Sequence, residues 1–134
     1  MEIQIATLED VEILTKYDRH IARQELENII ALTRVYIARE NGQFVGWLRY
    51  GLFWDNTPFC NMLFLLEGQR SKGYGRQIME RWEKDMKLQG YSNVMTSTPS
   101  DETAQHFYAR LGYEVTGAFR PEGEVTELIL AKNI

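Results

Sequence analysis

Hydrophobic residues follow two different spacings along this chain. Where they alternate with polar residues or form short apolar runs, strands are predicted, and where they recur every third or fourth position, helices are predicted. The predicted strands are residues 2–6, 35–38, 44–53, 59–66, 94–98, 113–119 and 125–132. The predicted helices are residues 8–17, 20–31 and 101–111, and a fourth that follows residues 70–75 and ends before Gly90. The pattern indicates one α/β unit, a mixed sheet with helices on both faces.

Short polar segments separate these elements. Asn41-Gly42 is typical of a two-residue hairpin turn, and residues 54–58 interrupt the next strand. Residues 59–66 are almost continuously apolar, which predicts a central strand buried on both faces. Gly90 and Gly112 stand where left-handed helix ends are expected.

Composition limits the class of protein. The 134 residues are enough for one compact domain, with residues 1–134 read as a single unit, and 44% of them are hydrophobic and 25% charged. No apolar run approaches the length of a membrane span, and the N-terminus lacks the basic start and long apolar block of a secretory signal, so a cytoplasmic protein is expected. The net charge of -4 disfavours a nucleic-acid partner and is compatible with a cationic amine.

The sequence gives little support for metal binding or for thiol chemistry. Cys60 is the only cysteine, and the two histidines, His20 and His106, are far apart, so no spacing typical of metal ligands occurs and no metal is expected. Cys60 is better explained as a buried filler than as a nucleophile. We expect His106 on an exposed helix face.

The strongest local feature is the turn between the apolar strand at residues 59–66 and the long helix. It consists of Arg70, Ser71, Lys72, Gly73, Tyr74 and Gly75, and Arg76 follows. Glycines at 73 and 75 can adopt backbone angles closed to other residues, and the start of a helix presents unpaired N–H groups. Such donors suit a pyrophosphate, and the helix dipole adds roughly 0.3–1 kcal/mol for a well-placed negative charge. The basic side chains of Arg70, Lys72 and Arg76 would add further attraction for the pyrophosphate.

Two other nucleotide-binding patterns fail on spacing. A P-loop needs Lys-Ser or Lys-Thr after its second glycine, which Gly73 lacks, and a dinucleotide fingerprint needs a third glycine where Ile78 stands. Taken alone, the turn is equally compatible with a plain strand-to-helix connection.

A second motif decides between these readings. Residues 104–113, AQHFYARLGY, place Phe107 beside Tyr108 on a helix that ends at Gly112. Together with the turn at residues 70–75, this closely resembles the GNAT superfamily of acetyl-CoA-dependent N-acetyltransferases. Both motifs occur in the family's order and at its separation, and the resemblance extends over the whole chain.

The resemblance implies a fold and a cofactor site. The fold would be a central mixed, mostly antiparallel sheet of about six to seven strands flanked by about four helices. Backbone groups of Leu65 and Leu66 would bind the pantetheine arm of acetyl-CoA, and the N–H groups of residues 70–75 its diphosphate. Asp101, where the family commonly has asparagine, could cap the following helix and accept a hydrogen bond from the cofactor, but an ionised carboxylate cannot donate one.

The resemblance also implies direct attack of an amine on the thioester, with Tyr108 as general acid to the departing thiolate. An alkylammonium loses its proton at neutral pH at a cost of about 4–5 kcal/mol. Proton transfer from a tyrosine of ordinary pKa to the thiolate costs only about 2 kcal/mol. Glu67 is a candidate base and Asp55 another, although each is more typical of a solvated loop; a water chain held by Thr96 and Ser97 stays open.

The acceptor is a small-molecule or peptide amine, and its identity is not encoded in a recognisable motif. Residues 20–30, 54–58 and 120–124 are expected to select it. The alternative to an enzyme is a non-catalytic acyl-CoA-binding or regulatory module of the same fold. Exposed strand edges are compatible with a homodimer.

Overall fold

A seven-stranded mixed sheet and four α-helices make up the fold of the computed structural model, which describes residues 1–134. In chain order the elements are β1 (Glu2–Ile5), the 3-10 helix η1 (Leu8–Asp10), α1 (Val11–Tyr17), α2 (Arg23–Ala31), β2 (Val35–Glu40), β3 (Gln43–Phe53), β4 (Thr57–Leu65), α3 (Tyr74–Leu88), β5 (Asn93–Pro99), α4 (Ala104–Arg110), β6 (Glu114–Phe119) and β7 (Glu127–Asn133). The sheet order is β1-β2-β3-β4-β5-β7-β6. The predicted fold class and the central position of β4 are therefore confirmed.

The chain forms two compact units. Unit 1 contains Met1–Gly51 and Met62–Met79, and unit 2 contains Leu52–Asn61 and Glu80–Ile134. Strand β4 and helix α3 each contribute residues to both units. The two units are described separately below.

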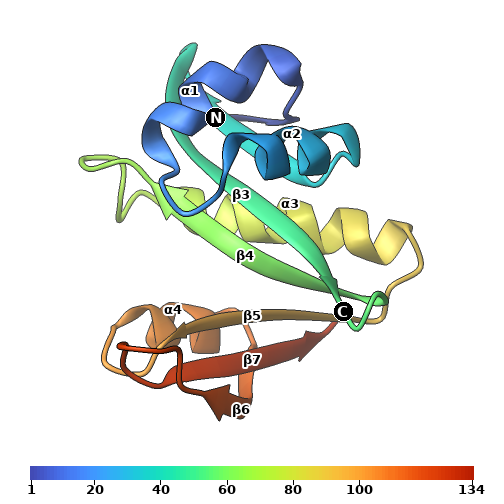
Figure 1. The fold of residues 1–134 in the computed structure, drawn as a ribbon, viewed down its shortest axis with the longest axis vertical. Coiled ribbons are helices and arrows are strands. Elements are labelled where there is room, and N and C mark those ends of the chain that lie inside the picture. Colours follow the sequence, from blue (N-terminus) through green and yellow to red (C-terminus); the bar gives the residue numbers. More distant parts are fainter. The chain divides into compact units, whose positions relative to one another are not determined.

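Unit 1 packs helices α1 and α2 on the antiparallel strands β1, β2 and β3 (Figure 1). Its core consists of apolar side chains at most 4% exposed: Ala6, Val11, Leu14, Leu26, Ile30, Val35, Ile37 and Trp47. The β2–β3 hairpin turns at Asn41 and Gly42, with φ of 51° and 78°. Both values lie in the left-handed region, as the predicted hairpin turn requires.

Unit 2 is built on β5, β7 and β6, which pair antiparallel, with α4 packed against β5 (Figure 1). The first part of β4 adds the one parallel pairing, in which Phe59 lies opposite Met95 and Cys60 opposite Thr96. Cys60 is 2% exposed and forms no disulfide, so its predicted burial is confirmed.

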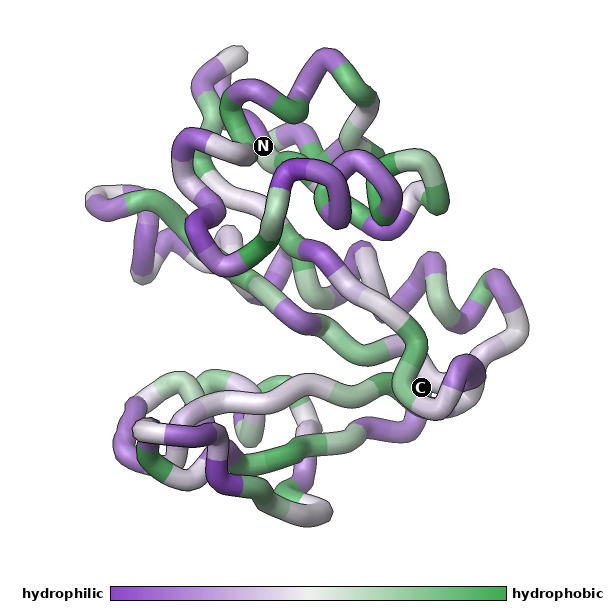
Figure 2. The backbone as a smooth tube through the Cα atoms, viewed as in Figure 1, coloured by the Kyte–Doolittle hydropathy of each residue, from purple (hydrophilic) through white to green (hydrophobic).

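Helix α3 shows the clearest match between pattern and structure. Hydrophilic and hydrophobic stretches alternate along it (Figure 2), and Ile78, Met79, Trp82 and Met86 are fully buried. The chain leaves the helix at Gly90, whose φ of 99° provides the predicted left-handed end.

Three element boundaries differ from the predictions. Helix α2 begins at Arg23 and not at residue 20, since the Asp18 carboxylate accepts the His20 N–H in a turn (3.1 Å). Helix α4 begins at Ala104 and not at residue 101. Strand β4 already begins at Thr57, because the hairpin turn needs only residues 54–56.

Strand β4 is also less buried than its apolar composition predicts. Asn61 and Phe64 are exposed, and most of the other residues are only partly buried. The prediction of a strand buried on both faces was wrong. An apolar run shows that a segment tolerates burial, whereas the structure decides which side chains are covered.

Candidate functional site

The turn at residues 70–75 adopts a backbone suited to binding an anion. Ser71 and Gly73 have left-handed φ values of 63° and 81°, and α3 begins immediately afterwards at Tyr74. Alternation of left-handed residues with others turns successive N–H groups toward one side. The expectation for Gly73 is confirmed. Gly75 has no positive φ and lies buried inside the first turn of α3, so it does not use the special backbone angles that glycine permits.

The N-terminus of α3 adds further donors. The first intrahelical bond runs from the Gln77 N–H to the Gly73 carbonyl (3.2 Å), so the N–H groups of Tyr74 and Gly75 lie ahead of the hydrogen-bond ladder of the helix. The first turn contains no acidic residue. No carboxylate of the first turn itself therefore offsets the positive end of the helix dipole.

Three basic side chains accompany this turn, and all are exposed. The Arg70 Nε donates to the Leu65 carbonyl (3.3 Å), and its guanidinium lies 5.1 Å from the centre of the Phe64 ring. The Lys72 Nζ reaches the Gln69 side chain at 3.5 Å. Arg76 is the third. These contacts are weak and exposed, so Arg70 and Lys72 can exchange them for a ligand anion.

The end of β4 lies next to the turn and runs close to β3. A Cβ atom on Gly46 would overlap the Phe64 carbonyl oxygen and approach the Leu65 side chain, so only glycine fits there. The Leu66 N–H donates to the Val45 carbonyl (2.9 Å) and is occupied. The Leu65 carbonyl accepts a hydrogen bond from the exposed Arg70 Nε, a side-chain contact that a ligand can displace.

Two acidic residues of the predicted site are solvent-exposed. Glu67 lies two residues after the end of β4, before Gly68 with its φ of 83°. Asp101 precedes α4 but does not cap it, because the N-cap residue is Thr103 and no side chain caps the helix end. The capping role expected for Asp101 was wrong. Instead, the Gln105 side chain donates to the Ser100 and Glu102 carbonyls, at 2.9 and 3.1 Å.

Tyr108 is buried on α4 in unit 2. It is 7% exposed, and its ring contacts those of Phe107 and Tyr113 edge to face, at centroid distances of 5.1 and 5.7 Å. Burial, and secondly the nearby Cys60, raise the pKa of Tyr108 well above its ordinary value, while a hydrogen bond with Thr96 lowers it. The phenol therefore keeps its proton at neutral pH, as a proton donor must. The exposed position expected for His106 on the same helix is confirmed.

Tyr113 is hydrogen-bonded to a largely buried ion pair between Glu83 and Lys132. The Tyr113 hydroxyl donates to the Glu83 carboxylate (2.7 Å), and the Lys132 Nζ pairs with the other oxygen of that carboxylate (2.7 Å). Burial and the bond to Glu83 raise the pKa of Tyr113 strongly. Because these residues are far apart in the chain, the sequence analysis missed the group.

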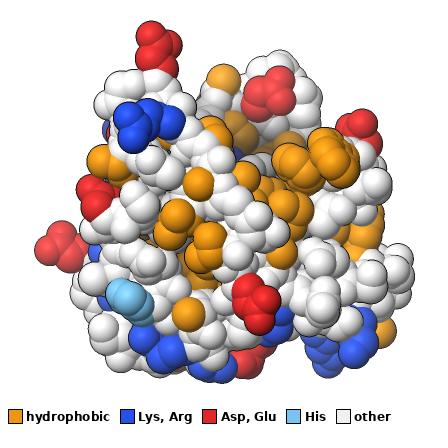
Figure 3. All heavy atoms as spheres, turned by 90° about the horizontal axis from the view of Figure 1, so that it is seen from below, with side chains coloured by type: hydrophobic (Ala, Val, Ile, Leu, Met, Phe, Trp, Pro, Cys, Tyr) orange, Lys and Arg blue, Asp and Glu red, His pale blue; other side chains and the backbone are white.

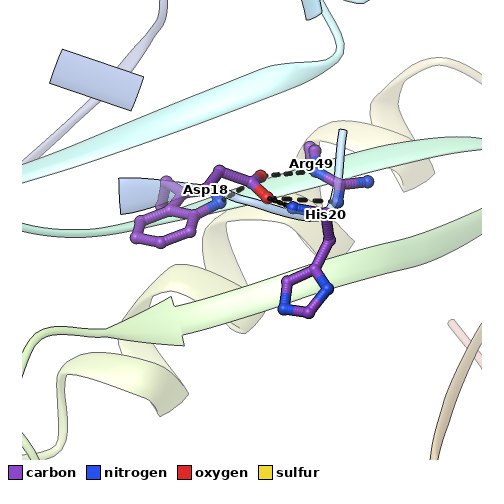
Figure 4. Close-up of polar contacts among 4 residues, drawn as sticks. Asp18, His20 and Arg49 are labelled. Atoms are coloured by element: carbon purple, nitrogen blue, oxygen red, sulfur yellow. Dashed lines mark hydrogen bonds and ion pairs between the residues drawn. The ribbon is translucent and has the colours of Figure 1, made fainter. Parts of the chain in front are cut away.

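A second buried ion pair lies in unit 1, where α1 meets the loop to α2 (Figure 4). The Asp18 carboxylate accepts hydrogen bonds from the Arg49 Nε (2.7 Å) and the Trp47 Nε1 (3.0 Å). The His20 backbone N–H also donates to Asp18, while its imidazole points away from the pair (Figure 4). The pair holds the segment that starts at residue 20, part of the region expected to select the acceptor. An arginine amid the apolar residues of β3 was a signal that a buried partner exists.

The structure also bears on metal binding, membrane spanning and association with a second copy of the chain. No group of three or more His, Cys, Asp or Glu side chains is arranged to hold a metal ion. No helix is both long and apolar enough to cross a membrane. Strand β6 is the last strand of the sheet and exposes Val115 and Phe119, and hydrophobic side chains reach the surface in several places in Figure 3. A homodimer stays a prediction.

Comparison with known proteins agrees with this arrangement. Residues 31–115 match the acetyltransferase (GNAT) domain family. No curated protein sequence matches the chain. Among solved structures, a similar fold occurs in Ard1 from Thermoplasma volcanium, with a TM-score of 0.86, 14% identity, and 99% of this chain and 97% of that chain covered. The PaiA N-acetyltransferase of Thermoplasma acidophilum in complex with coenzyme A has a TM-score of 0.82 and 18% identity, with 99% of this chain and 98% of that chain covered. Arabidopsis thaliana Naa50, in complex with the bisubstrate analogue CoA-Ac-MVNAL, has a TM-score of 0.80 and 15% identity, with 99% of this chain and 98% of that chain covered.

The fold is thus that of an acetyltransferase. Since the family match covers more than half of the residues, the chain belongs to the GNAT acetyltransferase family.

Proposed function

We propose that this protein binds acetyl-CoA and transfers its acetyl group to a primary amine. The observation that carries the proposal is the turn before α3, in which the left-handed Ser71 and Gly73 precede a helix start whose first turn contains no acidic residue. The N–H groups of Tyr74 and Gly75 lie there, ahead of the first helical hydrogen bond. A diphosphate matches this arrangement in both charge and hydrogen-bonding capacity.

The cofactor would be held mainly by backbone groups. The N–H groups of residues 70–76 would bind the diphosphate, with Arg70 and Lys72 adding charge. Binding would release Arg70 from the Leu65 carbonyl, and this carbonyl would then accept the N–H of a pantetheine amide. Asp101 would accept a hydrogen bond from the cofactor with its carboxylate.

In the proposed reaction the neutral amine attacks the thioester carbonyl carbon and forms a tetrahedral intermediate. The C–S bond then breaks, its electron pair goes to sulfur, and Tyr108 protonates the thiolate. The attacking nitrogen loses one proton to solvent, and a proton from solvent restores the phenol. The raised pKa of Tyr108 makes this proton transfer cost more than the roughly 2 kcal/mol of an ordinary tyrosine, by about 1.4 kcal/mol for each pKa unit. The phenolate that remains must therefore be stabilised by its surroundings.

Glu67 is the proposed base that removes the proton of the ammonium group, directly or through water. Its exposure provides contact with solvent, into which the proton can be passed. Glu67→Gln should lower transfer most at neutral pH and least at alkaline pH, where more of the amine is already neutral. An equal fall at all pH values would remove Glu67 from this role.

Cofactor binding is tested by calorimetric titration with acetyl-CoA. Gly73→Ala should weaken binding at least about tenfold, because alanine disfavours the left-handed angle on which the turn depends. Gly90→Ala is the matched control: Gly90 also has a positive φ and open space around a Cβ, but lies at the other end of α3. Absence of binding by the natural protein, or equal binding by both variants, would refute the proposed site.

Transfer is tested by screening amines for release of free CoA thiol. The panel should contain a polyamine, amino acids, aminoglycosides and peptides with free N-termini, including Met-Val-Asn-Ala-Leu, the peptide sequence bound to Naa50. Tyr108→Phe should abolish most of the activity found. Tight acetyl-CoA binding without transfer to any amine would favour a non-catalytic acyl-CoA-binding module.

A further inference from the structure

The hairpin between β3 and β4 ends in an unusual turn. Trp54 and Asp55 have φ values of 54° and 63°, and the Asn56 N–H donates to the Phe53 carbonyl (3.2 Å). Positive φ at both central residues is the mark of a type I′ turn, which strongly favours Asn, Asp and Gly. Asp55 meets this preference. Trp54 does not, because a bulky side chain is strained in the left-handed region.

The other hairpin of unit 1 shows what the turn would normally contain. Between β2 and β3 the chain turns at Asn41 and Gly42, with φ values of 51° and 78°. The two hairpins thus use similar backbone angles, but only the second places a tryptophan there. Strained residues of this kind are typical of binding and functional sites. The presence of Trp54 therefore requires a reason outside the turn itself.

Burial does not supply that reason. Trp54 is 80% exposed, whereas the other two tryptophans of the chain, Trp47 and Trp82, are 1% and 0% exposed. The Trp54 ring stacks on the Phe53 ring, with centroids 5.3 Å apart and an angle of 25° between the planes. Phe53 in turn contacts Phe59 at 6.2 Å. The indole is thus supported from one side and otherwise open to solvent, which lowers the entropy lost when a partner binds it.

The charges along this segment indicate what the ring can bind. Asp55 is exposed, and the sequence contains no lysine or arginine between Arg49 and Arg70. The face of an indole attracts cations, and a carboxylate beside it adds to this attraction. A second copy docked through the same tip would bring Asp55 against Asp55, and nucleic acid would also meet a like charge. A cationic partner is the complementary one.

We propose that Trp54 and Asp55 form a docking surface for a basic segment of another polypeptide. An arginine side chain fits best, because its planar guanidinium can stack on the open indole and donate hydrogen bonds to the Asp55 carboxylate at the same time. This inference is independent of acetyl transfer. It would stand if the protein bound no acetyl-CoA, and it is tested without that cofactor.

The binding test uses the labelled peptide Arg-Gly-Arg-Gly-Arg-Gly, blocked at both ends so that it offers no amine to acetylate. Its fluorescence anisotropy should rise saturably with the natural protein. Trp54→Leu should weaken binding about three- to tenfold, because leucine keeps an apolar side chain without the aromatic face. Trp54→Phe should weaken binding less. Leu88→Ala is the control, since Leu88 is also strongly exposed (76%) but lies at the end of α3, and it should bind like the natural protein.

Two comparisons test the role of charge. A peptide with glutamine in place of arginine should not bind. Asp55→Asn keeps a residue that suits the turn and removes the carboxylate, so it should also weaken binding. Equal binding of the two peptides, or unchanged binding by Trp54→Leu or Asp55→Asn, would overturn the proposal. So would concentration-dependent dimerisation that Trp54→Leu abolishes, because the occupant would then be a second copy.

Unfolding in urea tests whether folding alone explains the tryptophan. Trp54→Asn should leave the unfolding midpoint unchanged or raise it, because asparagine tolerates the left-handed angle, while peptide binding is weakened. Asn41→Trp is the matched reverse change in the other hairpin and should lower the midpoint. A clear fall in Trp54→Asn would show that the ring serves folding and would overturn the proposed docking role.

Discussion

Replacing Asp18 by asparagine should destabilise unit 1 strongly. Asp18 is 3% exposed and Arg49 8%, and the carboxylate also accepts from Trp47 and from the His20 backbone. The substitution removes the negative charge and leaves the guanidinium buried without a counter-charge. It also places an amide where only acceptors are needed.

The magnitude follows from burial. Removing one partner of a buried ion pair costs about 3–5 kcal/mol, out of a total unfolding free energy of about 5–15 kcal/mol for ordinary domains. With a urea dependence of about 2 kcal/mol per molar, the unfolding midpoint should fall by about 1.5–2.5 M. Adding Arg49→Met should recover part of the loss, because the unpaired charge is then removed.

The assay is urea unfolding followed by circular dichroism at pH 7. Glu12→Gln is the control. Glu12 pairs with Arg23 at 2.6 Å, which is shorter than the 2.7 Å between Asp18 and Arg49. The side chains of Glu12 and Arg23 are both more than half exposed. Its midpoint should hardly move, because solvent screens the pair. Equal shifts for Asp18→Asn and Glu12→Gln would refute the reasoning that burial, and not distance, decides the contribution.

Two further predictions concern close packing and pH. Gly46→Ala should lower the free energy of unfolding by at least about 1–3 kcal/mol in the same urea assay, because the new methyl group meets a backbone carbonyl. The control Gly117→Ala places its methyl group in open space and should change the free energy of unfolding little. Equal losses in the two variants would contradict this reasoning. The folded pKa of Tyr113 is raised above its unfolded value near 10, so its contribution to stability is complete below pH 10 and is lost as pH rises further. Urea midpoints at pH 8, 10 and 11 should therefore decline less in Tyr113→Phe than in the natural protein, and an identical decline would exclude Tyr113 as the cause.

Much of the fold was predictable because its signals are local. The helical spacing from Ile78 to Met86, the hairpin at Asn41-Gly42 and the helix ends at Gly90 and Gly112 each depend on a few neighbouring residues. Boundaries were less accurate where a distant or competing polar group intervened. The start of α2 is one example, because the Asp18 carboxylate that holds the turn before it is itself held by Arg49.

The candidate site was predictable to a similar extent. The turn at residues 70–75 and the segment around Tyr108 are continuous in the chain, so both could be recognised from their spacing. The assignments to Asp101 and Gly75 failed in part, because a residue type shows what a position can do and not which backbone geometry it adopts. Thr96 was expected at most to hold water, and its hydrogen bond to the Cys60 carbonyl follows from packing.

The sequence by itself therefore determined the order of elements, the glycine-bearing turn at residues 70–75 and the family, since hydrophobic period and glycine position act over a few residues. Only the tertiary structure decided which buried polar groups meet. Asp18 is 31 residues from Arg49 in the sequence. The separation is 36 residues between Thr96 and Cys60, and 49 residues between Lys132 and Glu83. The physical reason is that burial forces each polar group to find a partner, while the pattern of apolar positions leaves the identity of that partner open.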